Sequence, residues 1–178
     1  MENRKILILL TQFPGRSAKA LRWWTGCPYT HVSIGLDENM NTFYSFLMKG
    51  FIVEDIARYN RPGRRPFRCE LYAIDVSEET YQEVKDHLKT YVQNQESLHY
   101  TKIGLALSLA GIPWRSKNGY ICSYFVAEVL HRCTQIRLKR HSTLCMPKDF
   151  SHSRDMKMVF RGDLQHYTHC FGNRPYPA

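Results

Sequence analysis

The hydrophobic pattern of this chain changes its period near residue 77, and this change constrains the fold more than any other feature. Before it, short apolar segments are separated by turn residues, namely "KILILL" at 5–10, "THVSIGL" at 30–36 and "TFYSFL" at 42–47. Such segments are typical of β-strands. After it, apolar side chains recur at helical spacing. A chain that places strands first and helices afterwards is expected to adopt an α+β fold.

The remaining elements follow from the same signals. Ser77 is a suitable N-cap, and it is followed by Glu78 and Glu79, which favour the positive end of a helix. Further strands are expected at 50–56, 69–76 and 156–164, and helices at 16–26, 77–95, about 101–111 and 120–133. The chain has 178 residues, no repeats and no low-complexity segment. We therefore expect one domain over 1–178, with a loose C-terminal tail from about residue 171.

The chain is basic, with a net charge of +9. This charge favours anionic partners such as nucleic acid, an anionic membrane surface or acidic substrates. The densest cationic cluster is "RYNRPGRRPFR" at 58–68, which its Pro and Gly residues mark as a loop. Because the sequence contains no zinc-finger, RNP or helix-turn-helix signature, no nucleic-acid partner is expected. Peripheral contact with an anionic surface stays open. The pair Trp23-Trp24 either takes part in it or ends the first helix in the core.

No apolar run is as long as a membrane span, and the short run near the N-terminus does not match a signal peptide. A cytoplasmic protein with reduced cysteines is therefore expected. The six cysteines form no Cys-x-x-Cys pair, and "HYTHC" at 166–170 offers too few ligands for a full metal shell. No metal or other cofactor is expected. The oligomeric state is left open.

An ionisable residue, His31, stands at the head of an alternating strand. Side chains alternate along a strand, so His31 lies on the side opposite Val32. If the next turn centres near Asn39, the returning strand brings Ser45 to the side of His31. The small residues beside the imidazole leave room for another group. His31 is either part of a chemical site or an edge histidine on a half-exposed strand.

Cys122 falls in the first turn of the helix expected at 120–133. The backbone N–H groups of a first turn are unsatisfied and the helix dipole is positive there, so both stabilise a thiolate. A nucleophilic cysteine needs this environment. In the competing interpretation, Cys122 shares an apolar helix stripe with Val126 and Val129 and is a core residue. Together, Cys122 and His31 match the dyad of papain-like enzymes, in which the cysteine attacks an acyl carbon and the histidine acts as base and acid.

The segments that carry these two residues also resemble a known family. "YTHVSIGLD", "FYSF" and "NGYICSYFVAEVL" are similar to the circularly permuted NlpC-type papain-like proteins, the YiiX-like group. That group places the histidine strand before the cysteine helix, as His31 and Cys122 are placed here. "CELYAIDVSEETYQEV" and "MPKDF" extend the likeness to residues 5–165. The resemblance implies an antiparallel sheet packed against helices.

The resemblance also implies site residues and a reaction class. Tyr29 matches a tyrosine that polarises the acyl oxygen, with the backbone N–H of Cys122 as the other donor. The place of a third catalytic residue, often Glu in the group, is taken here by Ser45, and Glu54 on the next strand is a conceivable substitute. The implied activity is a thiol hydrolase, of amidase or peptidase type, acting on amide or ester bonds.

Three functions stay open at this point. The first is a cysteine hydrolase that uses Cys122 and His31 and passes through an acyl-thioester. The second is a lipid-directed acyltransferase or thioesterase on the same dyad. The third is a non-catalytic relative that keeps the fold and binds a ligand. The expected substrate is a small molecule, a peptide or a lipid conjugate.

Overall fold

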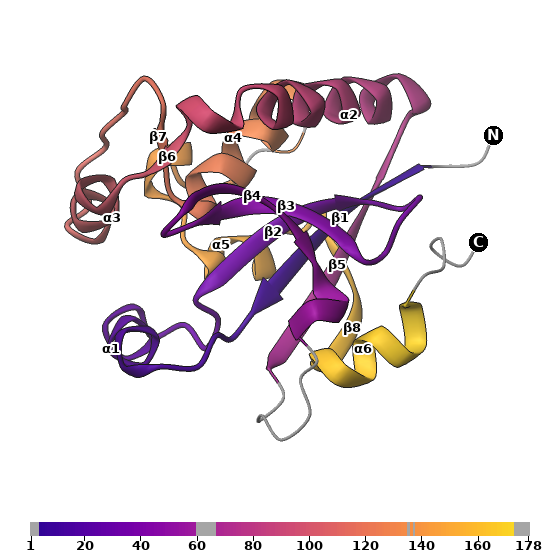
Figure 1. Ribbon diagram of the computed structural model, residues 1–178, viewed down its shortest axis with the longest axis horizontal. Helices are drawn as coiled ribbons and strands as arrows, with labels where there is room; N and C mark the ends of the chain where they lie inside the picture. Colours follow the sequence, from indigo (N-terminus) through magenta and orange to yellow (C-terminus); the bar gives the residue numbers. More distant parts are fainter. Residues whose placement is uncertain (1–3, 60–66, 135, 137, 173–178) are drawn as a thin grey trace.

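A central antiparallel sheet organises the molecule. The structure, a computed structural model, describes residues 4–59, 67–134, 136 and 138–172. Six strands form the sheet in the order β4-β3-β2-β1-β5-β8, and each pair of neighbours is antiparallel (Figure 1). The strands are β1 (Arg4–Thr11), β2 (His31–Leu36), β3 (Thr42–Leu47), β4 (Gly50–Asp55), β5 (Arg68–Val76) and β8 (Lys157–Asp163). The predicted α+β class and each predicted strand are confirmed.

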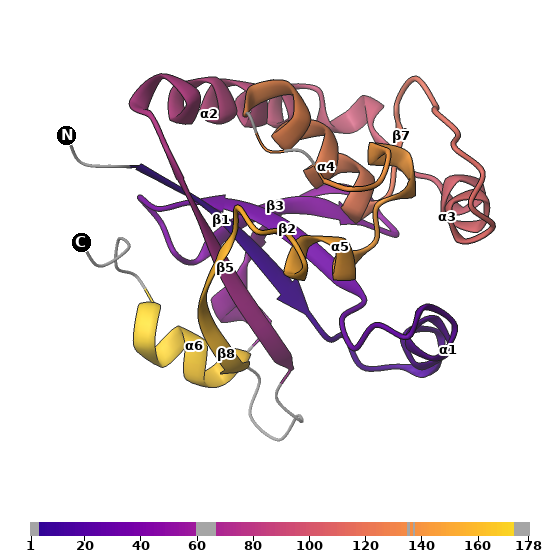
Figure 2. The ribbon, with the colours of Figure 1, turned by 180° about the vertical axis from the view of Figure 1, so that it is seen from behind.

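Helices cover both faces of the sheet. The longest ones, α2 and α4, lie over one face, and α6 lies on the other (Figures 1 and 2). The helices are α1 (Arg16–Thr25), α2 (Glu78–Gln93), α3 (Lys102–Leu109), α4 (Cys122–Cys133), α5 (Pro147–Ser151) and α6 (Leu164–Phe171). A short 3-10 turn, η1 (Ile56–Tyr59), follows β4, and two more, η2 (Gln95–Ser97) and η3 (Ser142–Leu144), lie in connections. A separate parallel pair joins β6 (His99–Tyr100) to β7 (Gly119–Tyr120).

Burial on both faces explains why β1 is a continuous apolar run rather than an alternating one. Ile6 and Ile8 belong to the larger core cluster, beneath α2 and α4. Leu7 and Leu9 belong to the smaller cluster, beneath α6. Because successive side chains of a strand point to opposite faces, a strand covered on both sides needs apolar residues at every position.

Local capping signals set the helix ends as the sequence indicates. The side chain of Ser77 accepts a hydrogen bond from the backbone N–H of Thr80 at 3.2 Å and so caps α2. Gly26 ends α1 in the left-handed conformation, with φ of 64°. Cys122 is the first residue of α4, so its predicted place in the first helical turn is confirmed. Its helix is buried throughout the segment from Cys122 to Leu130.

Several sequence-based interpretations are corrected by the packing. The tryptophan pair does not end α1 in the core, because Trp23 is 84% exposed and Trp24 68% exposed. The "HYTHC" segment belongs to α6 rather than to a tail, and "MPKDF" forms most of α5. Residues 60–66 of the basic loop and the tail beyond residue 172 lie outside the described residues. None of the helices that the structure describes is long and apolar enough to cross a membrane.

Candidate active site

The first turn of α4 presents Cys122 without a side-chain cap. Ile121 precedes it in an extended conformation, with φ of −109° and ψ of 160°, and its side chain offers no hydrogen-bond acceptor. The helical hydrogen bonds begin with the N–H of Phe125, which donates to the carbonyl oxygen of Ile121 at 3.0 Å. The N–H groups before it, including that of Cys122, therefore lie at the positive end of the helix with no partner in their own helix.

His31 begins β2 and lies deep in the protein. It pairs with Thr11 at the end of the β1–β2 ladder and is 2% exposed. Since β2 is an interior strand whose six residues are all buried, the interpretation of His31 as a half-exposed edge residue is wrong. The ring of Phe13 lies against the imidazole, with the two ring centroids 4.9 Å apart. This contact fixes one side of the imidazole ring.

The orienting partner of His31 is Glu54, from β4. Oε1 of Glu54 lies 2.5 Å from Nε2 of His31, and both side chains are almost fully buried. Because Glu54 engages Nε2, Nδ1 is the ring nitrogen left to face Cys122. A carboxylate on one ring nitrogen fixes the tautomer and the orientation of the other.

These neighbours decide the protonation state of His31. Burial by itself lowers the pKa of His31, but the charge of Glu54 and hydrogen bonding with both Cys122 and Glu54 raise the pKa to about 10. The imidazole is therefore positively charged at neutral pH. His31, Glu54 and Cys122 come from three separate elements, and the fold brings them together.

Ser45 does not hold the imidazole. Its hydroxyl donates to the carbonyl oxygen of Val32 at 2.7 Å. The β2–β3 ladder pairs Ile34 with Tyr44 and Gly35 with Phe43, so the predicted turn near Asn39 is correct. The ladder pairs end there, and Ser45 supplies a hydrogen bond to β2 beyond them. The expectation that Ser45 is the third member is thus corrected in favour of Glu54.

Tyr29 is directed towards another carboxylate. Burial and then hydrogen bonding to Glu70 raise the pKa of Tyr29, so its hydroxyl stays protonated. Glu70 also accepts hydrogen bonds from Tyr72 at 2.7 Å and from Nε of Arg161 at 2.6 Å. The role of Tyr29 at an acyl oxygen stays a prediction.

The sequence gives no sign that Tyr100 interacts with the Cys122 thiol, but the structure shows that it does. Burial and then the charge of Cys122 raise the pKa of Tyr100, which keeps its hydroxyl protonated close to the sulfur. Tyr100 forms β6 with His99, a strand too short to leave a periodic signal. No motif in the sequence connects it with Cys122.

Four other cysteines lie in environments that disfavour a thiolate. Burial raises the pKa of Cys27 and Cys133, and it raises the pKa of Cys69 and Cys145 to about 12. Acidic neighbours, Asp163 beside Cys69 and Asp149 beside Cys145, act in the same direction. Among the buried cysteines that the structure describes, only Cys122 interacts with an imidazolium.

An apolar groove reaches the site between α1 and α3. It has a volume of about 580 Å³. Its lining includes Thr30, which precedes His31, Phe13, which contacts the His31 ring, and Tyr100. Its walls are formed by Pro14, Ser17, Ala18, Ala20, Leu21, Trp24, Met48, Leu105 and Leu109. Among the residues that the structure describes, no charged one lines this groove, so the described lining suits an apolar group.

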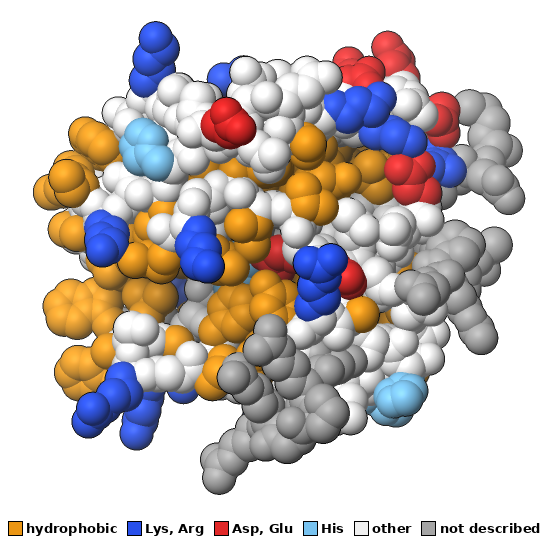
Figure 3. Space-filling model, in the orientation of Figure 1, with side chains coloured by type: hydrophobic (Ala, Val, Ile, Leu, Met, Phe, Trp, Pro, Cys, Tyr) orange, Lys and Arg blue, Asp and Glu red, His pale blue; other side chains and the backbone are white. Residues whose placement is uncertain are grey.

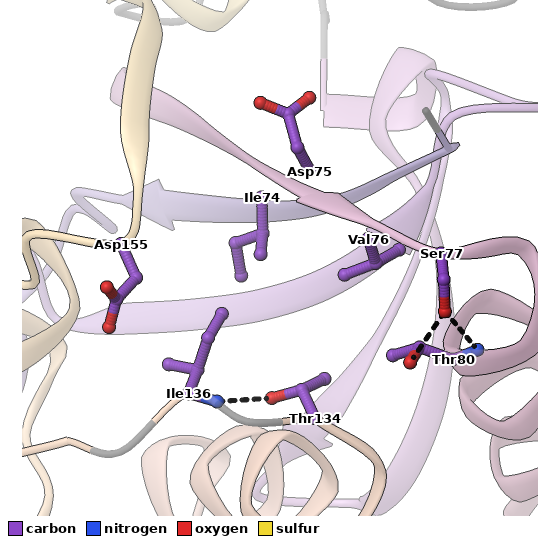
Figure 4. Close-up of a pocket in the computed structure, with 8 residues that line it drawn as sticks. All are labelled: Ile74, Asp75, Val76, Ser77, Thr80, Thr134, Ile136 and Asp155. Atoms are coloured by element: carbon purple, nitrogen blue, oxygen red, sulfur yellow. Dashed lines mark hydrogen bonds between the residues drawn. The ribbon is translucent and has the colours of Figure 1, made fainter. Parts of the chain in front are cut away.

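A second hollow, of about 510 Å³, lies at the opposite end of the sheet (Figure 4). It is bordered by Val76, which pairs with Arg4 at the end of β1 remote from His31. Asp75 at its edge is already paired with Lys5 and Lys157. Nothing in this hollow matches the cysteine–histidine chemistry.

Comparison with known proteins supports the fold. No family model and no curated protein matches the sequence. Among solved structures, the metalloprotein YiiX from Escherichia coli O157:H7 aligns with a TM-score of 0.63 at 12% identity, over 91% of this chain and 99% of that chain. YiiX is described as a metalloprotein, whereas no group of three or more His, Cys, Asp or Glu side chains within the described ranges could hold a metal ion. The chain thus shares the α+β architecture of YiiX.

The buried ion pair predicts a specific dependence of stability on pH. The raised pKa of His31 stabilises the folded state fully below the ordinary value of 6.5, and this contribution is lost as pH rises through about 10. Glu54→Gln removes the charge that holds this proton. We expect the free energy of unfolding of Glu54→Gln to fall less steeply between pH 7 and 10 than that of the wild type, as measured by urea denaturation.

Ser45→Ala is the matched control for this measurement. It removes one buried hydrogen bond to Val32, which costs about 1 kcal/mol at every pH. Its slope between pH 7 and 10 is expected to equal that of the wild type. A wild-type slope in Glu54→Gln, or a flattened slope in Ser45→Ala, would contradict the assignment of Glu54 as the partner of His31.

Proposed function

We propose that the protein is a papain-like cysteine hydrolase of the permuted, YiiX-like type, which cleaves an amide or ester bond through an acyl-thioester on Cys122. The observation that carries this proposal is the arrangement of Glu54, His31 and Cys122, in which a buried carboxylate keeps the imidazole charged beside a thiol. An imidazolium and the positive end of a helix both favour the thiolate, which is the nucleophilic form. The shared architecture with YiiX is consistent with this fold assignment.

The first half of the reaction forms the acyl-enzyme. The Cys122 thiolate attacks the carbonyl carbon, a C–S bond forms, and the carbonyl π electrons move onto the oxygen. The N–H of Cys122, at the uncapped start of α4, is placed to donate to this oxyanion. The tetrahedral intermediate then collapses, its C–N or C–O bond breaks, and Nδ1–H of His31 gives its proton to the leaving group.

The second half releases the acid. Neutral His31 takes a proton from water, the resulting hydroxide attacks the thioester carbon, and the C–S bond breaks. This step returns the thiolate of Cys122 and the imidazolium of His31. Glu54 stays ionised and stabilises the imidazolium at both ends of the cycle, which is the role of the carboxylate in hydrolytic triads.

Covalent labelling tests the proposal. We expect p-nitrophenyl acetate to acylate Cys122, with a burst of one p-nitrophenolate per protein and an added acetyl mass on the peptide that carries Cys122. Iodoacetamide at mildly acidic pH should label Cys122 before the other five cysteines, because Cys122 has a cationic neighbour. His31→Ala is expected to slow both reactions by roughly 100-fold or more.

Cys145→Ala serves as the control, since it removes a buried thiol that lies against carbonyl oxygens of the chain. It should retain the burst, and Cys122→Ala should abolish it. Equal labelling of all six cysteines, or a burst that survives in Cys122→Ala, would exclude a nucleophilic Cys122.

A second candidate is a lipid-directed thioesterase or acyltransferase on the same dyad. The apolar groove favours it, because its lining includes Phe13 and Thr30, which contact and precede His31. A fatty-acyl chain bound there would lie beside these neighbours of His31. Each buried methylene group contributes about 0.8 kcal/mol, so the groove should select long acyl chains.

This candidate predicts a dependence on acyl-chain length. We expect kcat/KM for the p-nitrophenyl octanoate ester to exceed that for the acetate by at least about tenfold. Ala18→Trp, which fills the groove, should remove this preference and leave acetate turnover unchanged. Ala106→Trp places the same residue on an exposed position of α3 that does not line the groove, and should behave like the wild type. Equal rates for both esters would exclude the groove as an acyl-chain site.

A further inference from the structure

A set of large apolar side chains stands exposed on one side of the molecule. We define the α1–α3 face as helix α1, helix α3 and the segment 110–117 that follows α3. Its exposed side chains are Trp23 (84%), Trp24 (68%), Ile103 (65%), Ile112 (51%) and Trp114 (37%). Exposed apolar residues are common singly, but a contiguous group of this kind marks an interaction site.

The two segments form one continuous surface. Residues of α1 and α3 are the opposite walls of the apolar groove, with Trp24 and Leu105 among them. Trp114 lies close to α3, since a Cβ atom at Gly104 would stand 3.4 Å from the Trp114 ring. Figure 1 shows α1 and α3 projecting from the same side of the sheet, and Figure 3 shows hydrophobic side chains gathered on that side.

The Lys and Arg residues of the α1–α3 face are not balanced by acidic residues. Neither α1 nor the segment 102–117 contains an Asp or Glu residue, although the whole chain has 16. Both segments carry cations, namely Arg16, Lys19, Arg22, Lys102, Arg115 and Lys117. Lys and Arg side chains flank the hydrophobic group in Figure 3. The partner of this face is therefore expected to be anionic as well as apolar.

The packing of α1 points to the same partner. The helix has ten residues and none of them is buried. A helix of this length gains little stability in water without an apolar face packed against something. Trp side chains prefer the boundary between the headgroups and acyl chains of a bilayer, and cations on the same helix bind anionic headgroups.

We propose that the α1–α3 face docks on the surface of a bilayer that contains anionic phospholipids. In this orientation the tryptophans enter the headgroup region and Arg16 and Lys19 contact lipid phosphates and carboxylates. The mouth of the groove between α1 and α3 then faces the bilayer. Docking uses no part of the cysteine–histidine pair, so it is independent of the proposed hydrolase activity.

Vesicle sedimentation with the full chain tests this proposal. We expect the protein to sediment with phosphatidylcholine vesicles that contain 30% phosphatidylserine, and to bind pure phosphatidylcholine vesicles at least about tenfold more weakly. Binding should weaken as salt is raised from 0.1 to 0.5 M. The double variant Trp23→Ala/Trp24→Ala should lose at least about tenfold in partitioning.

A charge-matched pair of variants separates this face from general basicity. Arg16→Glu/Lys19→Glu changes two exposed cations of α1, whereas Lys89→Glu/Arg154→Glu makes the same change in net charge elsewhere. Only the first pair should reduce binding. Equal loss in both pairs, or no binding by a wild type whose circular dichroism shows it folded, overturns the proposal. Self-association that the tryptophan double variant abolishes, without vesicle binding, also overturns it, in favour of a second copy as occupant.

The acylation of Cys122 by p-nitrophenyl acetate, measured on the same proteins, distinguishes the two proposals. Arg16→Glu/Lys19→Glu should keep the burst of the wild type, because neither residue lines the groove. Loss of vesicle binding with an intact burst assigns the effect to the α1–α3 face alone. A missing burst with intact vesicle binding overturns the hydrolase proposal and leaves the docking surface in place.

Discussion

The contact between Glu54 and His31 is the interaction on which the candidate site depends. Two ionisable side chains are held almost fully out of water, which carries a large desolvation cost. The attraction between the carboxylate and the imidazolium opposes that cost, and the short contact between Oε1 and Nε2 supplies it. The consequence extends beyond stability, because an imidazole that is charged at neutral pH in the resting site changes what the neighbouring Cys122 thiol can do.

The antiparallel sheet makes this contact possible. His31 lies at the end of β2 and Glu54 on β4, two strands away in the sheet order. The β2–β3 ladder is short, and Ser45 bonds to Val32 beyond its last pair. On the other side, α4 lies against β2 and β3 with its first residue towards His31. Cys122 and His31 thus come from segments that lie far apart in the sequence.

Much of the fold was accessible from the sequence. The period change at residue 77, the cap at Ser77 and the left-handed Gly26 located strands and helices correctly, because these signals act over a few residues. Cys122 and His31 were found for a similar reason: the start of a helix and the start of a strand are local features. The class of site that they form follows from their residue types.

The errors concern features that depend on long-range packing. Ser45 lies on β3, beside β2, and Glu54 lies on β4, one strand further. Which of them reaches Nε2 depends on how far the ladder extends, which no local pattern reveals. The interaction of Tyr29 with Glu70, on β5, joins two residues that no local pattern connects. Tryptophan is highly buried on average, which favours the core alternative for Trp23-Trp24, yet both side chains are exposed. The exposure of these tryptophans can be interpreted only once α3 is seen beside α1, with the groove between the two helices.

The measurement that tests the account most directly is a nitrogen-15 NMR titration of the His31 imidazole in the full chain between pH 5 and 11. If Glu54 holds the proton, both ring nitrogens keep the shifts of an imidazolium through neutral pH and change only near pH 10. Titration of His31 near 6.5, the ordinary value for histidine, would contradict the charged pair and with it the activated thiol at Cys122.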